Sequence, residues 1–155
     1  MTINLAPGKQ YKFEVSATDN AGNASSFAAG SQFTLTAFTT SASAITYSSG
    51  WTTATLAGSF SGTVHFTKTV GKKATLSFTG SQVEWVSTLG AVHGSAAVAL
   101  DGGTPVTVNT HAATGTTRDG VFVATASSGA HTLVVTNKAT SGRPRIDVDA
   151  FVIIS

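Results

Sequence analysis

Apolar and polar side chains alternate with a period of two along most of this 155-residue chain, and glycine-rich turns separate the alternating runs. Residues 10–18, for example, place Tyr11, Phe13 and Val15 on one face and polar or charged residues on the other. The composition favours strands as well, because 26 Thr, 15 Val and 5 Ile stand against 7 Leu and 2 Glu. These features exclude a helix bundle and predict an all-β chain.

Turn signals divide the alternating runs into a hairpin and a β-sandwich. The hairpin comprises residues 10–18 and 31–38, and the Ser- and Thr-rich residues 39–44 are predicted to be a linker. Asp101-Gly102-Gly103 has the residues of a tight hairpin turn of the primed type. The strands expected in the sandwich are short and closely spaced: 45–47, 63–69, 74–79, 82–88, 95–100, 105–109, 120–125, 130–136 and 145–154.

Charge and cysteine content exclude several classes of protein. Charged residues make up 10% of the chain, the net charge is +2, and Lys72-Lys73 is the one adjacent basic pair, which argues against nucleic-acid binding. The chain has no cysteine, so it contains no disulfide and no thiolate metal site. No apolar run reaches the roughly 20 residues of a membrane-spanning helix. The segment Met1–Ala6 lacks the basic and apolar regions of a signal peptide.

The first part of the chain resembles the final third of a fibronectin type III domain. The matching residues are Leu5, Pro7-Gly8, Tyr11, the alternating run 13–17, and the turn 19–25. In bacterial extracellular proteins such domains separate enzymes from binding modules. The resemblance implies that residues 1–38 are a partial fibronectin type III-like segment whose preceding strands are absent.

Residues 45–155 resemble the galactose-binding-like jelly-roll domains of bacterial secreted and surface proteins. The matching segments are Ile45-Thr46-Tyr47 with Gly50-Trp51, 74–80, 83–86, 94–102, 129–133 and 147–152. Many such domains are carbohydrate-binding modules, and others serve in adhesins, phage fibres and enzyme scaffolds. The resemblance implies a jelly roll, an antiparallel β-sandwich, and a role in recognition of glycans or surfaces.

Sugar-binding sites combine an aromatic face for the pyranose ring with planar polar groups for its hydroxyls. Trp85 shares a strand face with Val83 and is assigned to the core, and Asp101 is assigned to its turn. Trp51 follows Gly50, so the sequence leaves open whether it is a lid over the core or an exposed platform. The candidate ligand-binding residues are aromatic or planar polar: Tyr47, Trp51, His93, Arg118, Asp119, Arg143 and Arg145.

Metal-binding and catalytic patterns are sparse. Jelly-roll carbohydrate modules often hold a structural calcium, and Asp147 and Asp149 are the candidate ligands, although strand 44–48 supplies no acidic partner. A hydrogen bond to neighbouring backbone is the alternative role for Asp149. Of the histidines, His65 is expected to face solvent and His131 to make a structural hydrogen bond. No nucleophile and base are paired in the sequence, so the chain is not expected to be an enzyme.

Two function classes remain. The first is a non-catalytic carbohydrate-binding or cell-surface recognition module of a secreted bacterial protein, with a polysaccharide or surface glycan as partner. The second is a structural segment of an extracellular fibre, phage tail or surface layer that assembles through exposed sheet edges. The apolar face of residues 10–38 (Tyr11, Phe13, Val15, Phe33 and Leu35) is expected to be covered by a neighbouring chain or by parent sequence, not by residues 45–155.

Overall fold

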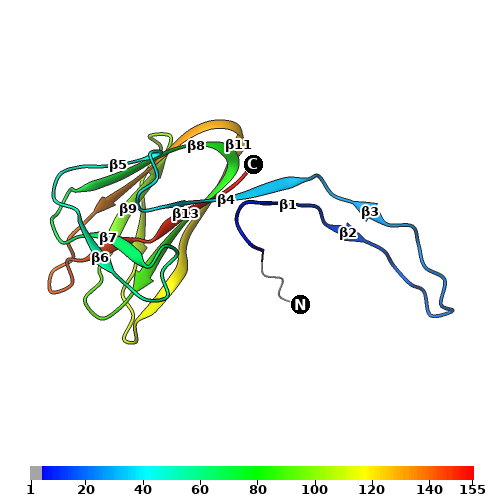
Figure 1. The fold of residues 1–155 in the computed structure, drawn as a ribbon, viewed down its shortest axis with the longest axis horizontal. Coiled ribbons are helices and arrows are strands. Elements are labelled where there is room, and N and C mark those ends of the chain that lie inside the picture. Colours follow the sequence, from blue (N-terminus) through cyan, green and yellow to red (C-terminus); the bar gives the residue numbers. More distant parts are fainter. Residues whose placement is uncertain (1–4) are drawn as a thin grey trace.

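The computed structural model describes residues 5–155, which form a fold of strands and turns and no helix (Figure 1). The prediction of an all-β sandwich is therefore confirmed. The described residues include no helix that could cross a lipid bilayer. Residues 1–4, which begin the predicted fibronectin-like segment and the segment Met1–Ala6, lie outside the described part. The strands are β1 (Lys9–Tyr11), β2 (Glu14–Val15), β3 (Ala28–Ala29), β4 (Phe33–Thr39), β5 (Ile45–Tyr47), β6 (Thr52–Thr55), β7 (Thr63–Thr67), β8 (Lys73–Leu89), β9 (Ser95–Leu100), β10 (Val106–Asn109), β11 (Thr116–Asn137), β12 (Ile146–Val148) and β13 (Ala150–Ile154).

An eight-stranded antiparallel sheet in the order β1-β4-β13-β8-β11-β9-β10 dominates the fold, with β5 added at the first part of β8. A three-stranded sheet, β12-β7-β6, packs beside it, and β2 and β3 form a separate two-stranded ribbon. The predicted strand 145–154 is divided at Asp149, so its two halves belong to different sheets. Strand β6 was not predicted, because its residues are Thr52-Thr53-Ala54-Thr55 and show no apolar alternation.

Two long strands replace four of the predicted short ones. Strand β8 joins the predicted segments 74–79 and 82–88, and β11 joins 120–125 and 130–136. The buried face of β8 changes phase between Phe78 and Val83, which marks a bend in the strand. Gly80 lies at the bend and lets the end of β13 approach closely, because a Cβ atom there would lie 2.6 Å from the carbonyl oxygen of Ile154. A single strand can therefore serve both ends of the sandwich.

The core lies between the two main sheets and contains Trp85, as predicted. Trp85 and Phe151 are fully buried, and the same cluster includes Phe78, Leu133 and Val148. Leu100, the remaining predicted neighbour, is partly buried against this cluster. The Trp85 indole N–H donates to the backbone oxygen of Asp147 at 3.2 Å, so the core tryptophan also ties β8 to β12.

The N-terminal arm, defined here as residues 5–32, projects away from the sandwich (Figure 1). Phe13, Val15 and Phe27 on the arm are 51%, 68% and 70% exposed. Residues 45–155 thus leave most of the arm uncovered, while its covering by another chain stays a prediction. Strand β4 was predicted to belong to the fibronectin-like segment. In the structure it pairs with β13 from Leu35 to Thr39 and forms part of the large sheet.

Candidate functional site

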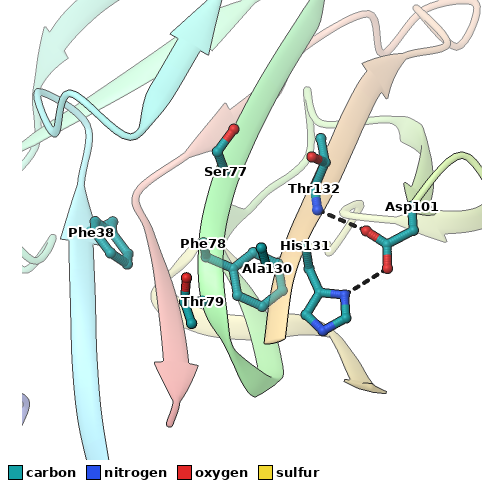
Figure 2. A pocket seen from close by; sticks show the side chains of 8 residues that line it. All are labelled: Phe38, Ser77, Phe78, Thr79, Asp101, Ala130, His131 and Thr132. Carbon is teal, nitrogen blue, oxygen red and sulfur yellow. Dashed lines mark hydrogen bonds and ion pairs between the residues drawn. The ribbon is translucent and has the colours of Figure 1, made fainter. Parts of the chain in front are cut away.

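An open groove of about 660 Å³ lies at the bend of β8. Strand β8 pairs with β5 as far as Leu76 and with β13 from Gln82 onward, so no strand pairs with this edge of β8 in between. Figure 2 shows Phe38 at one end of the groove and Asp101 at the other. The groove is lined by Phe38, Ser77, Phe78, Thr79, Asp101, Ala130, His131 and Thr132.

A charged clamp fixes the Asp101 end of the groove. Asp101 has a φ of 50° and precedes Gly102 with a φ of 70°, which confirms the predicted primed turn. One carboxylate oxygen accepts the backbone N–H of Thr132 at 2.8 Å, and the other lies 2.7 Å from Nδ1 of His131. Nε2 of His131 lies 2.7 Å from the backbone oxygen of Ser127. The hydrogen-bonding role predicted for His131 is therefore confirmed.

Both ring nitrogens of His131 face acceptors, since neither a carboxylate nor a carbonyl oxygen carries a proton to donate. The ring can therefore donate both hydrogen bonds only in its doubly protonated, cationic form. The hydrogen bond with Asp101 raises the pKa of His131, and the backbone N–H of Thr132 together with His131 lowers the pKa of Asp101. The Asp101 side chain is 46% exposed, so the clamp presents a fixed anionic acceptor at the rim of the groove.

A second group of charged residues lies buried where β12 meets the loops between strands. Arg145 donates from Nε and Nη2 to the two carboxylate oxygens of Asp147 at 2.6 and 2.8 Å. Nε2 of His93 lies 3.2 Å from Oδ2 of Asp147, although the orientation of the His93 ring is unfavourable for a hydrogen bond. Burial acts to raise the pKa of Asp147, but the contacts with His93 and Arg145 outweigh it and lower that pKa. His93 and Arg145 were predicted to bind ligand, and here both contact the buried carboxylate of Asp147, with Arg145 supplying the opposite charge.

The predicted calcium ligands do not fit a calcium ion. Arg145 engages both oxygens of Asp147, and Oδ1 of Asp149 accepts the backbone N–H of Phe60 at 2.9 Å. Calcium takes six to eight oxygen ligands, and residues 5–155 hold no cluster of three acidic or histidine side chains. The alternative role of Asp149, a hydrogen bond to backbone, is the one that the structure shows.

Trp51 and Tyr47 form an aromatic layer over the core. The ring centroids of Tyr47 and Trp51 are 5.2 Å apart, and the indole nitrogen of Trp51 is buried. Trp51 is therefore the lid over the core, one of the two alternatives left open by the sequence. The expectation that His65 faces solvent is wrong, because its ring is half-buried and stacks on Tyr47 at 4.5 Å. Burial lowers the pKa of His65 and raises that of Tyr47.

The remaining predicted ligand residues lie in two different places: Arg118 and Asp119 near the start of β11, and Arg143 in a turn. The guanidinium carbon of Arg118 lies 4.2 Å from the ring centroid of Phe60, beside a hollow of about 240 Å³. Asp119 accepts a hydrogen bond from the Thr116 hydroxyl. Arg143 lies in the turn between β11 and β12, where its N–H donates to Thr140. The structure thus does not bring the seven predicted residues together in one site.

None of the seven residues predicted to bind ligand lines the groove. Alternation along β8 places Ser77 and Thr79 on the outer face, so this part could have been identified from the pattern. The position of Phe38 beside β8 and β11 depends on β4 joining the large sheet, which no local signal indicates.

Solved structures with a similar fold belong to proteins that act on carbohydrates. A family two carbohydrate esterase from Cellvibrio japonicus matches with a TM-score of 0.60 at 13% identity, over 79% of this chain and 34% of the esterase. The GH26-CBM35 β-(1,4)-mannanase of Podospora anserina matches with a TM-score of 0.53 at 15% identity, over 78% of this chain and 28% of the enzyme. The CBM36-1 domain of a multidomain xylanase from the hindgut metagenome of Trinervitermes trinervoides matches with a TM-score of 0.50 at 14% identity, over 78% of this chain and 96% of that domain.

These similarities show the fold, since the identities are low. The chain spans about a third of the length of the esterase, whereas it spans nearly the whole of the CBM36-1 domain. No protein-family model and no curated protein sequence matches the chain. The resemblance of the first segment to fibronectin type III domains stays a prediction. The jelly-roll β-sandwich is the part of the family resemblance that the structural neighbours support.

Proposed function

We propose that this chain is a non-catalytic carbohydrate-binding module of a secreted protein, and that it binds a neutral polysaccharide along the groove at the bend of β8. The observation that carries the proposal is the groove itself, which joins an aromatic side chain, a row of hydroxyls and a fixed carboxylate in one open hollow. Its volume of about 660 Å³ lies within the usual range for ligand sites, about 300–1,000 Å³.

Each component of the groove matches a feature of a sugar chain. The ring of Phe38 can contact the apolar C–H face of a pyranose, and the hydroxyls of Ser77 and Thr79 can exchange hydrogen bonds with sugar hydroxyls. Asp101 accepts hydrogen bonds strongly because it is ionised and immobile. Among the described residues, the groove is lined by no lysine or arginine, and His131 is already paired with Asp101, so no free cation is available for an acidic polysaccharide and the proposed ligand is neutral.

The groove lacks the pair of carboxyl groups with which most glycosidases work. Asp101 is the one carboxylate among its lining residues, and two hydrogen bonds already occupy it. Glycosidases use a general acid and a second carboxylate about 5–10 Å away. This supports a binding role for the groove and no catalytic one. The fold similarity to the CBM36-1 domain points in the same direction.

Binding of a panel of neutral and acidic polysaccharides, measured by affinity electrophoresis and titration calorimetry, tests the proposal. We expect a neutral polysaccharide to bind and Phe38→Ala to weaken binding at least about tenfold, since stacking and burial of one ring contribute more than about 1.4 kcal/mol. Thr79→Arg fills the groove from an exposed position and should abolish binding without unfolding the domain. Phe27→Ala, on the exposed arm, is the matched control and should bind normally. Binding that survives Thr79→Arg would rule out the groove.

A structural role in a fibre or surface layer is the second candidate, and the exposed arm favours it. Phe13, Val15 and Phe27 carry apolar surface that no described part of the chain covers. A second copy could pair with the arm through residues 10–38 and bury this surface. Light scattering over a range of protein concentrations tests this role: polymers that disappear when residues 1–31 are deleted would support it, and a monomer at all concentrations would exclude it.

A further inference from the structure

A second, smaller hollow of about 240 Å³ lies on the outer face of the large sheet, apart from the groove. It shares no lining residue with the groove. Its walls are mainly apolar, but two oppositely charged side chains enter it. The lining residues are Leu5, Pro7, Leu35, Phe60, Glu84, Val86, Arg118, Gly120 and Val152.

Glu84 is positioned in this hollow by a glycine on the neighbouring strand. A Cβ atom on residue 120 would lie 1.7 Å from Oε1 of Glu84, so a side chain there would displace the carboxyl group from this position. Among residues 5–155 the Glu84 carboxylate makes no hydrogen bond and no ion pair. Burial raises its pKa. An acceptor without a partner on a partly buried sheet face is available to a ligand.

Arg118 brings a positive charge and hydrogen-bond donors to the same hollow. It has a φ of 60°, a conformation that costs free energy for any residue except glycine. Its guanidinium carbon lies 4.2 Å from the centroid of the Phe60 ring, and within the described range its side chain donates no hydrogen bond. This cation–π contact holds the guanidinium beside the hollow and leaves its N–H groups available to donate. Asp149, whose charge acts on Arg118, offsets part of the positive charge.

We propose that this hollow is a second binding site and that it takes the acetamido group of an N-acetylated sugar. The carbonyl oxygen of the group would accept from Arg118, its N–H would donate to Glu84, and its methyl would contact Val86 and Val152. A neutral amide satisfies both charged side chains, whereas a carboxylate ligand is repelled by Glu84 and an ammonium ligand by Arg118. The hollow is also too small for an extended polymer, which favours a compact terminal group over a peptide chain.

Titration of the full chain with N-acetylglucosamine and with glucose, followed by amide chemical shifts, tests the proposal, since the two sugars differ at one substituent. We expect N-acetylglucosamine to shift the amides of Val86, Arg118, Gly120 and Val152, and glucose to leave them unchanged. Arg118→Met removes the guanidinium but keeps an unbranched apolar side chain, and it should weaken binding at least about tenfold. Arg143→Met, in another turn, is the matched control and should leave affinity unchanged.

Gly120→Ala provides an independent variant, because it displaces the Glu84 carboxylate without removing any charge. We expect it to abolish the response to N-acetylglucosamine while circular dichroism shows a folded domain. Equal responses to both sugars, or full affinity in Arg118→Met, would overturn the proposal. Tighter binding of an N-acetylated dipeptide at the same residues would overturn it as well and assign the hollow to peptides. Phe38→Ala affects only the groove, so failure of the proposed function and failure of this site are distinguishable.

Discussion

Arg145→Met removes the guanidinium that pairs with a buried carboxylate and lies 4.2 Å from the centroid of the Phe66 ring, and it keeps an unbranched apolar side chain. Asp147 has no exposed surface, and Arg145 donates two charge-assisted hydrogen bonds to it. Without the guanidinium, the His93 ring at 3.2 Å is the remaining side-chain contact of the carboxylate. Removing one member of a buried ion pair typically costs about 3–5 kcal/mol. We therefore expect Arg145→Met to lower the free energy of unfolding by about that amount near neutral pH.

The pH dependence follows from the lowered pKa of Asp147. A carboxyl whose pKa is lower in the folded state stabilises the fold above its unfolded pKa of about 3.9, and this stabilisation is lost as the pH falls through the folded value. The deficit of Arg145→Met should therefore be largest at neutral pH and shrink in acid. Urea denaturation of both proteins between about pH 3 and 7 measures this difference.

The variants Asp147→Asn and Arg145→Met/Asp147→Asn complete a double-mutant cycle. We expect the double variant to be more stable than the sum of the single changes predicts, by at least about 1 kcal/mol, because the buried charge is no longer left alone. A deficit of Arg145→Met below about 1 kcal/mol that does not change with pH would refute the reasoning, since it would mean that Asp147 is not held as a buried anion.

Three further predictions concern the core, the clamp and the arm. Trp85→Ala should cost about 3–5 kcal/mol in urea denaturation, because it leaves a large cavity and removes the hydrogen bond to Asp147; a loss under about 1 kcal/mol would contradict the packing. The pKa of His131 is raised in the fold, so its stabilising contribution is present below the unfolded value of about 6.5 and is lost as the pH rises through the folded value. Melting temperatures should therefore fall with rising pH in the native protein and less so in His131→Gln, and parallel curves would contradict the clamp. Deletion of residues 1–31 should leave a folded sandwich, whereas deletion of residues 1–40 also removes β4 from β13 and should destabilise it; equal stability by urea denaturation would show that β4 contributes nothing.

Local sequence patterns predicted those parts of the fold that depend on residues close together in the sequence. Period-two alternation identified most strands, and the face shared by Val83 and Trp85 identified the core. The Asp-Gly pair predicted the turn at Asp101, because its backbone conformation depends on those residues alone. The joining of short segments into β8 was missed, since Gly80 has the appearance of a turn residue and its role depends on β13.

The site was harder to predict because it depends on contacts between distant residues. His93 lies far from Asp147 in the sequence. The two residues come into contact only because the fold brings the loop that carries His93 next to β12, where both side chains are buried. Asp101 was assigned to its turn, which is correct, but the same residue also forms the rim of the groove. Phe38 reaches the groove through the pairing of β4 with β13, which alternation within β4 does not specify.

The most direct test of the proposed carbohydrate site is a map of amide chemical shifts during titration with the neutral oligosaccharide whose polymer binds best. The account predicts that the shifts cluster at Phe38, Ser77, Thr79, Asp101 and Thr132, on the strands that surround the groove. Shifts confined to Tyr47 and Trp51 or to the loops around Asp147, with the amides of the groove unchanged, would contradict the account.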